Sequence, residues 1–126
     1  MKTIIRTENA PAAIGPYNQA AEYNGLIFTA GQIPLDPETG KLVETSFGDR
    51  VYQVMNNLKA ILEEAGSDFS KVIKTTIYVT DLGNYAELNK IYGEFFPGEN
   101  APARAAIQVA GLPLGTDVEI EMIAHK

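Results

Sequence analysis

The chain of 126 residues contains no cysteine and a single histidine, His125, next to its end. The absence of cysteine excludes disulfides, zinc–thiolate sites and cysteine nucleophiles. A terminal histidine is expected to be mobile and solvated, and no loop carries the acidic spacing of a calcium site. We therefore expect no metal, and any chemistry must use other side chains.

Long apolar runs and basic runs are also missing. No stretch approaches the roughly 20 apolar residues of a membrane-spanning helix, and the first residues lack the apolar core of a signal peptide. The default expectation is a cytoplasmic protein with no membrane partner. With 10 basic and 16 acidic residues, the formal net charge is −6. Such a chain repels phosphate backbones, so no nucleic acid is expected as a partner.

The length suits a single domain over residues 1–126, and 45% hydrophobic with 21% charged residues is an ordinary globular composition. A short strand is expected over residues 2–7. Asn24-Gly25, between Tyr23 and Leu26, predicts a hairpin because both turn residues need positive φ. Apolar residues at three- and four-residue steps predict a helix from Phe47 to Ala65, capped by Ser46 and ended by Gly66.

The second half continues with a β-branched strand over residues 70–81. Asn84 with Glu87 resembles a capping box for a second helix, which Pro97-Gly98 ends. The apolar face expected for this helix consists of Tyr85, Leu88, Tyr92, Phe95 and Phe96. Two more strands follow. The order β, β-hairpin, α, β, α, β, β predicts an α+β fold, with two helices on one face of a mixed β-sheet.

The last two strands, in APARAAIQVAGLPLGTDVEIEMIA, carry charges of opposite sign. Strand alternation gives each of them two faces. In the first strand one face holds Arg104, Ala106 and Gln108, and the other holds Ala105, Ile107 and Val109. In the second, one face holds Val118, Ile120 and Met122, and the other holds Glu119 and Glu121. We expect the apolar side of each strand to pack against the helices and the charged sides to share the opposite face.

The charged face has two interpretations. In the common arrangement it faces water, where an exposed Arg–Glu pair contributes only about 0–1 kcal/mol. However, Arg104 has only small neighbours, which leave room for a ligand or a partner chain. A guanidinium grips a carboxylate with two hydrogen bonds, and a nearby glutamate exchanges protons with water. This pair suits addition or elimination beside a carboxylate. Tyr17 is either a phenolic donor there or a half-buried loop residue.

The sequence resembles the RidA group of the Rid (reactive intermediate deaminase, YjgF-like) family over nearly its whole length. The resemblance is carried by AIGPYNQA, FTAGQIPLDPETG, NLKAILEEAGSDFSKVIKTTIYVTDL and YGEFFPGENAPARAAIQVAGLPLGTDVEIEMIA. It implies a chorismate-mutase-like fold and a homotrimer whose sheets form a central barrel, with ligand sites between subunits. It also implies hydrolysis of 2-imino acids, such as 2-iminobutanoate and 2-iminopropanoate, to 2-keto acids and ammonia without a cofactor.

The resemblance also implies roles for individual residues. Arg104 matches the residue that binds the substrate carboxylate, Glu119 the residue that positions or activates water, and Tyr17 a tyrosine that lines the pocket. The remaining pocket positions are Ala30, Gly31, Asn89 and Ala106. Many relatives have serine in place of Ala30 and cysteine in place of Ala106, so this chain lacks that hydroxyl and that thiol. Strand alternation does not separate Glu119 from Glu121; only the resemblance favours Glu119.

Two other functions stay open at the level of sequence. One is a regulatory trimer that binds keto acids without turnover; the presence of both Arg104 and Glu119 favours catalysis over it. The other is an RNA-cleaving inhibitor of translation, against which the acidic balance and the absence of a basic patch count.

Overall fold

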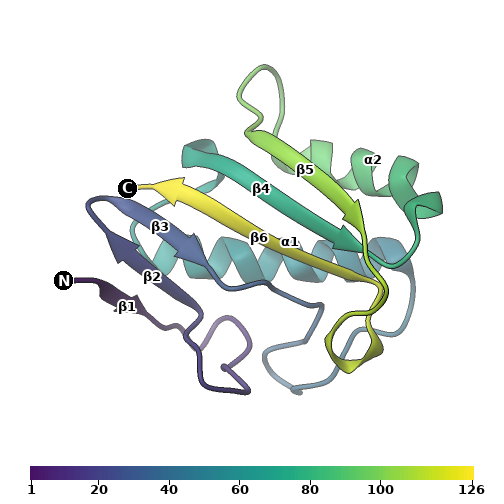
Figure 1. Ribbon diagram of the computed structural model, residues 1–126, viewed down its shortest axis with the longest axis horizontal. Coiled ribbons are helices and arrows are strands. Elements are labelled where there is room, and N and C mark those ends of the chain that lie inside the picture. The colour runs from purple at the N-terminus through teal and green to yellow at the C-terminus, as the bar shows by residue number, and fades with distance from the viewer.

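A six-stranded twisted sheet carries both helices on one of its faces in the computed structural model, which describes residues 1–126 (Figure 1). The elements in chain order are β1 (Thr3–Ile5), β2 (Ala20–Tyr23), β3 (Leu26–Thr29), α1 (Phe47–Glu64), β4 (Val72–Val79), α2 (Tyr85–Phe95), β5 (Ala103–Gln108) and β6 (Val118–His125). The strand order is β1-β2-β3-β6-β4-β5, and only the β4–β5 pair is parallel. The predicted α+β class and mixed sheet are confirmed. No helix is long and apolar enough to cross a membrane.

The β2–β3 hairpin forms where the sequence predicts it. Asn24 has φ of 51° and Gly25 has φ of 79°, the left-handed pair that a tight two-residue turn requires. The last strand pairs with this hairpin, so that Leu26 lies opposite His125. The backbone of His125 is therefore fixed in the sheet, whereas the expected solvation of its side chain agrees with the structure. Its backbone is part of β6 and its carbonyl accepts a hydrogen bond from Ser67 at 2.6 Å, whereas its side chain is exposed.

Helix α1 also begins and ends at the predicted signals. Ser46 accepts a hydrogen bond from the backbone of Asp49 at 3.0 Å, and Gly66, with φ of 81°, follows the last turn. The buried face of α1 packs on the sheet and forms the centre of the core. Its fully buried apolar side chains are Val51, Val54, Met55, Leu58, Ile61 and Leu62.

Helix α2 begins differently from the prediction. Asn84 makes no side-chain cap and instead ends a short 3₁₀ turn, Leu82–Asn84, which Asp81 caps by accepting from the backbone of Gly83 at 2.7 Å. The capping box of Asn84 and Glu87 is therefore wrong, because the 3₁₀ turn already satisfies the start of the helix. The predicted face is right in part. Of the predicted residues, Leu88, Tyr92 and Phe96 are buried and Phe95 is half-buried, whereas Tyr85 is exposed. Ile91, which the prediction does not include, is also buried.

The faces of β5 are the reverse of the expectation. The parallel register pairs Thr75 with Arg104 and Ile77 with Ala106, and paired residues project to the same side of a sheet. Thr75 and Ile77 are buried beneath the helices. Arg104, Ala106 and Gln108 therefore lie on the helix side, and Ile107 lies on the other side with 44% of its surface exposed. From this edge strand the guanidinium of Arg104 reaches α2, where its carbon lies 4.9 Å from the centre of the Tyr92 ring.

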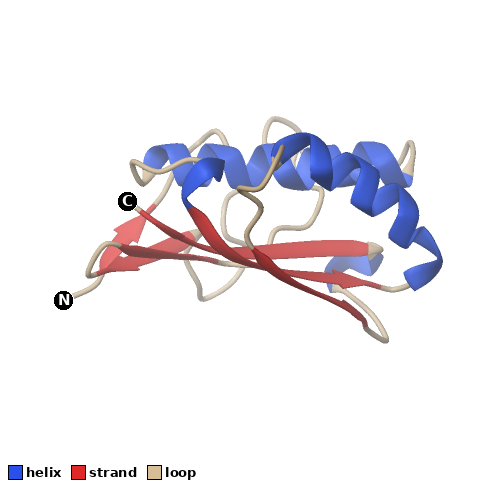
Figure 2. Cartoon of the chain, turned by 90° about the horizontal axis from the view of Figure 1, so that it is seen from above, coloured by secondary structure: helices blue, strands red, loops and turns tan.

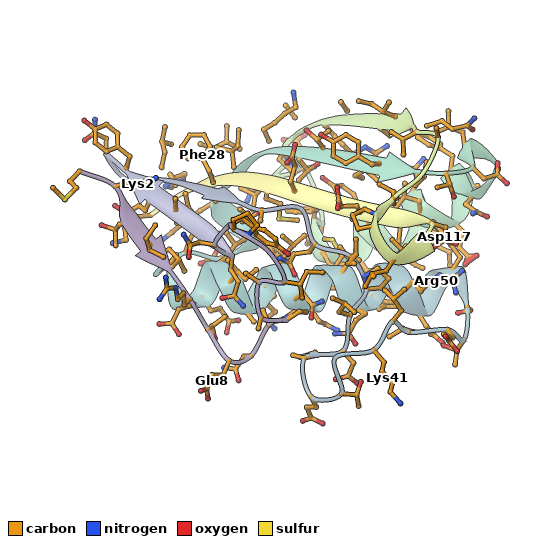
Figure 3. All side chains as sticks on the ribbon, turned by 60° about the horizontal axis from the view of Figure 1, so that its bottom comes forward. Lys2, Glu8, Phe28, Lys41, Arg50 and Asp117 are labelled. Atoms are coloured by element: carbon orange, nitrogen blue, oxygen red, sulfur yellow. The ribbon has the colours of Figure 1, made fainter.

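The face of the sheet away from the helices, here called the open face, is uncovered in the single chain (Figure 2). Glu119 and Glu121 project from β6 onto this face, opposite Tyr78 and Thr76 of β4. Its exposed apolar residues are Ile4, Tyr23, Leu26, Phe28 and Ile107. Phe28 is marked in Figure 3. The open face therefore combines the carboxylates of β6 with exposed apolar side chains on β1, β2, β3 and β5.

An ion pair fixes the segment that leads into β6. Both Nε and Nη2 of Arg50, in the first turns of α1, donate to the carboxylate of Asp117, at 2.8 and 2.7 Å. Figure 3 shows these two side chains meeting. The paired geometry matches the fork of a guanidinium to a carboxylate and is stronger than a single contact. It holds the backbone two residues before Glu119.

A buried asparagine fixes the loop that follows Gly31. Asn57 of α1 has 1% of its surface exposed, and its amide donates to the carbonyls of Leu35 at 2.9 Å and Ile33 at 3.4 Å. Its own oxygen accepts from Gln53 at 2.9 Å. All of its polar atoms are therefore bonded, and its amide nitrogen holds this loop against the helix.

We expect Asn57→Ala to lower the free energy of unfolding by about 2–3 kcal/mol, because it leaves buried carbonyls without a donor. The measurement is urea unfolding followed by circular dichroism. The matched control is Asn56→Ala, which changes an exposed asparagine on the same helix and should leave stability nearly unaltered. Equal effects of the two substitutions would contradict the role given to Asn57.

Candidate active site

Glu119 lies in a hollow with Tyr17 and Gly31, here called the glutamate half. The N-terminal loop, the segment after β3 and the start of β6 form its walls. The residues lining it are Pro11, Ala12, Ile14, Tyr17, Gln19, Gly31, Gln32, Ile33, Leu35, Pro113 and Glu119. One carboxylate and one phenol thus share a small hollow of about 50 Å³, in which five of the eleven lining residues are hydrophobic.

Gly31 provides the space for the Glu119 side chain. A Cβ atom at position 31 would lie 2.7 Å from Cδ and 2.9 Å from Oε2 of Glu119, which is closer than van der Waals contact allows. Any larger residue would therefore displace the carboxylate. Gln32 exchanges two backbone hydrogen bonds with Ile120, which holds Gly31 beside β6. Ala30, the residue before it, is anchored through its N–H to the carbonyl of Gln19 at 2.8 Å.

A buried glutamine holds the loop that carries Tyr17. The side-chain amide of Gln19 donates to the carbonyls of Thr7, Ala10 and Pro11, at 3.0, 3.2 and 2.8 Å. The phenolic oxygen of Tyr17 accepts from the backbone N–H of Ile14 at 3.3 Å, and the side chain is 46% exposed. Tyr17 is therefore an accessible phenol on a loop of fixed shape. No sequence motif indicated this role for Gln19.

The structure distinguishes the two glutamates of β6. Burial raises the pKa of the Glu119 carboxyl above its ordinary value, and the neighbouring charge of Glu121 raises this pKa further. Glu121 instead accepts a hydrogen bond at 2.9 Å from the hydroxyl of Tyr78, a bond that raises the pKa of that tyrosine. Glu119 thus lines the hollow and holds its proton more tightly than an ordinary glutamate does. Glu121 is instead hydrogen-bonded to Tyr78 of β4.

Arg104 lies in a second group, here called the arginine half, which β5 and α2 build together. Its guanidinium carbon lies 4.9 Å from the centre of the Tyr92 ring and 5.4 Å from that of Tyr85. Nη2 donates to the hydroxyl of Tyr85 at 2.8 Å. The Tyr92 hydroxyl is hydrogen-bonded to Thr75 at 2.8 Å, and burial raises the pKa of Tyr92. Cation–π contacts with two rings keep the guanidinium in place.

The arginine half also contains the two other predicted positions on this side. Ala106 follows Arg104 by two residues on the same face of β5 and packs against the core. Asn89 is exposed and lies one helical turn beyond Tyr85 on α2, on the side that Tyr92 also shares. Tyr85 was expected only as a core residue, so its contact with Arg104 was missed.

The two halves do not meet within one chain. Arg104 projects from the helix side of β5, whereas Glu119 projects from the open face of β6. The structure therefore brings Tyr17, Ala30, Gly31 and Glu119 together, and separately brings together Asn89, Arg104 and Ala106. A site that uses both charges needs two copies of the chain.

The remaining hollows offer less chemistry. A hollow of about 500 Å³ also has Tyr17 in its lining, and its arginine, Arg6, already donates twice to Asn18, at 3.3 and 3.2 Å. No group of three or more His, Cys, Asp or Glu side chains lies close enough together to hold a metal ion. The glutamate and arginine halves are therefore the best candidates for function.

The raised pKa of Glu119 makes a prediction about stability. Because the folded state binds this proton more tightly than the unfolded chain, ionisation of Glu119 lowers stability as the pH rises from the ordinary glutamate range through the folded pKa. We expect Glu119→Gln to raise the melting temperature by a few degrees at pH 7 and by less at pH 4, measured by differential scanning calorimetry.

The control for this prediction is Glu64→Gln, which removes the same charge from an exposed position at the end of α1 and should have little effect at either pH. A Glu119→Gln variant that is less stable than the original chain at pH 7, or that has the same advantage at both pH values, would contradict the desolvation of Glu119.

Comparison with known proteins agrees with this architecture. The model of the Endoribonuclease L-PSP family matches residues 7–126. The RutC family protein PH0854 of Pyrococcus horikoshii is 49% identical over 100% of this chain and 99% of its own length. The 2-iminobutanoate/2-iminopropanoate deaminase of Mus musculus is 46% identical over 98% of this chain and 91% of its own length.

A solved structure extends the likeness to three dimensions. The Rid-family protein YyfA of Yersinia pestis, described as a protein of unknown function, superimposes with a TM-score of 0.97 and 45% identity over the whole of both chains. Its fold is thus nearly the same as the arrangement of helices and strands described above. The Reactive Intermediate Deaminase A of Arabidopsis thaliana is 48% identical over 98% of this chain and 65% of its own length. The chain belongs to the Endoribonuclease L-PSP family, and its relatives include proteins named for the Rid family and for reactive intermediate deaminase.

Proposed function

We propose that the chain is a hydrolytic deaminase of 2-imino acids, including 2-iminobutanoate and 2-iminopropanoate, and that it releases 2-keto acids and ammonia. The observation that carries the proposal is the state of Arg104. Two tyrosine rings hold its guanidinium, and only one of its N–H groups is bonded to the chain. The remaining donors suit a carboxylate, and the name of the mouse relative supports the reaction.

The reaction follows from what the two charged groups can do. Arg104 binds the carboxylate of the imino acid and so fixes the position of the imine carbon. Glu119 accepts a proton from a water molecule, which adds to the carbon of the protonated imine and forms a carbinolamine. Glu119 then returns the proton to the leaving nitrogen, the C–N bond breaks to release ammonia, and the hydroxyl proton of the carbinolamine passes to Glu119 as the keto group forms. The raised pKa of Glu119 favours this exchange of a proton. No cofactor takes part.

We infer that each site lies between two copies of the chain in a homotrimer. In a ring with heterologous contacts, every copy gives Arg104 to one neighbour and Glu119 to the other. Two observations support this arrangement. The two side chains project from opposite faces of one sheet, and the open face presents exposed apolar residues such as Phe28 and Ile107. Joining three such faces produces the proposed central barrel.

The other pocket positions have supporting roles in this proposal. Tyr17 lines the side of the pocket next to Glu119, and Gly31 keeps space for the carboxylate. Ala30 and Ala106 contribute backbone and small volume, and neither has a side-chain hydroxyl or thiol. Asn89 lies at the edge of the arginine half. Binding of keto acids without turnover is the alternative, and ammonia release above the uncatalysed rate separates the two.

Cleavage of RNA is a further candidate, because the matching family bears the name of an endoribonuclease. It agrees less well with this chain. The net charge is −6, and Glu119 and Glu121 place two carboxylates on the open face. Both features repel a phosphate backbone. RNA binding that weakens steeply with salt would be needed to support this function.

We expect Arg104→Ala to lower kcat/KM for 2-iminobutanoate by about 100-fold or more, since a charge-assisted bidentate contact is lost. Arg104→Lys should recover only part, because an ammonium lacks the fork. The measurement is keto-acid and ammonia release when an amino-acid dehydratase or oxidase generates the imine in place.

The control for the arginine variants is Lys59→Ala, which removes a cation from the exposed side of α1 and should act as the unaltered chain does. Full activity of Arg104→Ala would remove the proposed mechanism.

A further inference from the structure

Tyr85 begins α2 and contacts Arg104 in two ways. Its ring centre lies 5.4 Å from the guanidinium carbon, and its hydroxyl accepts a hydrogen bond from Nη2 at 2.8 Å. The hydroxyl donates to no group of the chain, so its proton stays available. Tyr85 is also 40% exposed, which leaves this proton within reach of a ligand.

The two tyrosines beside Arg104 differ in what their hydroxyls do. Tyr92 is 6% exposed, and its hydroxyl is occupied by Thr75, so this ring serves as a buried support for the guanidinium. Tyr85 lies at the accessible end of the group, where its oxygen touches the same nitrogen that would bind a ligand. Only Tyr85 combines a contact to Arg104 with a free donor.

We propose that the Tyr85 hydroxyl is a binding group for the carboxylate held by Arg104, to which it donates a third hydrogen bond. This inference rests on the proposed function, and it adds a substrate-binding residue to the arginine half. A carboxylate offers about four acceptor positions, of which a guanidinium fork uses two. The phenol accepts from Arg104 and donates to the same ligand, so that each bond strengthens the next.

The Tyr85 hydroxyl has an alternative role as a holder of the guanidinium alone, and this role predicts the opposite change in the affinity for a carboxylate ligand. If the hydroxyl only held the guanidinium while the site is empty, a ligand would have to break that bond before it could bind. Removal of the hydroxyl would then tighten binding. If the hydroxyl contacts the carboxylate, its removal weakens binding. The sign of the change in affinity therefore decides between the two.

The test is Tyr85→Phe, which removes the hydroxyl and retains the ring over the guanidinium. We expect the Kd of 2-oxobutanoate, measured by titration calorimetry, and the KM for 2-iminobutanoate to rise about ten-fold, the effect of losing one hydrogen bond to a charged group. The turnover number kcat should change less than about two-fold, because the bond is made equally in ground and transition states.

The matched control is Tyr52→Phe, which removes the hydroxyl of an exposed tyrosine on α1 that is bonded to Glu94. It should leave the Kd of 2-oxobutanoate unchanged. The comparison is valid if both variants have melting temperatures close to that of the original chain. An unchanged or lower Kd for Tyr85→Phe overturns the proposal, as does the absence of 2-oxobutanoate binding by the original chain.

These outcomes separate this inference from the deaminase proposal. Binding of 2-oxobutanoate that depends on Tyr85, without acceleration of imine hydrolysis, would contradict the deaminase and support the binding role of Tyr85. Imine hydrolysis with the same Kd and KM in Tyr85→Phe as in the original chain would support the deaminase and contradict the role of Tyr85.

Discussion

The alternation of side chains across one sheet separates the two charges on which the proposed chemistry depends. The parallel register of β5 on β4 directs Arg104 to the helix side, and the antiparallel register of β6 directs Glu119 to the open face. Neither register can shift by one residue without turning a buried set of side chains outward. The same core packing that stabilises the fold thus keeps the two charges apart within one chain, and for this reason the proposed mechanism requires a second copy.

Each half is organised before any ligand or neighbour arrives. Arg104 is held between the rings of α2, and Glu119 occupies the space that Gly31 leaves. This organisation has a cost, because a carboxylate that is partly desolvated beside Glu121 destabilises the folded chain at neutral pH. Such a conflict between stability and function is typical of active sites. Contact with a neighbouring copy would also cover the apolar residues of the open face.

The sequence predicts those parts of the fold that local signals determine. Asn24-Gly25 and the Ser46 cap are short-range features, and the hairpin and α1 form where they indicate. The faces of β5 could not be predicted, because alternation defines two sets of residues and leaves their direction to pairing with β4. The more apolar set, with Ile107, faces away from the helices because its partner in the parallel register is Tyr78 rather than a buried residue of β4. Tyr85 carries no motif, although its spacing of seven residues from Tyr92 could have indicated a shared contact.

The central claim is that one site takes Arg104 from one copy and Glu119 from another. Its most direct test combines Arg104→Ala and Glu119→Gln chains, each inactive alone, by refolding an equal mixture. In a ring of three with random mixing, about a quarter of the sites pair an intact arginine with an intact glutamate. The account predicts that imine hydrolysis returns to about that fraction of the original activity. A mixture no more active than the two separate variants, tested on assemblies shown to contain both chains, would contradict it.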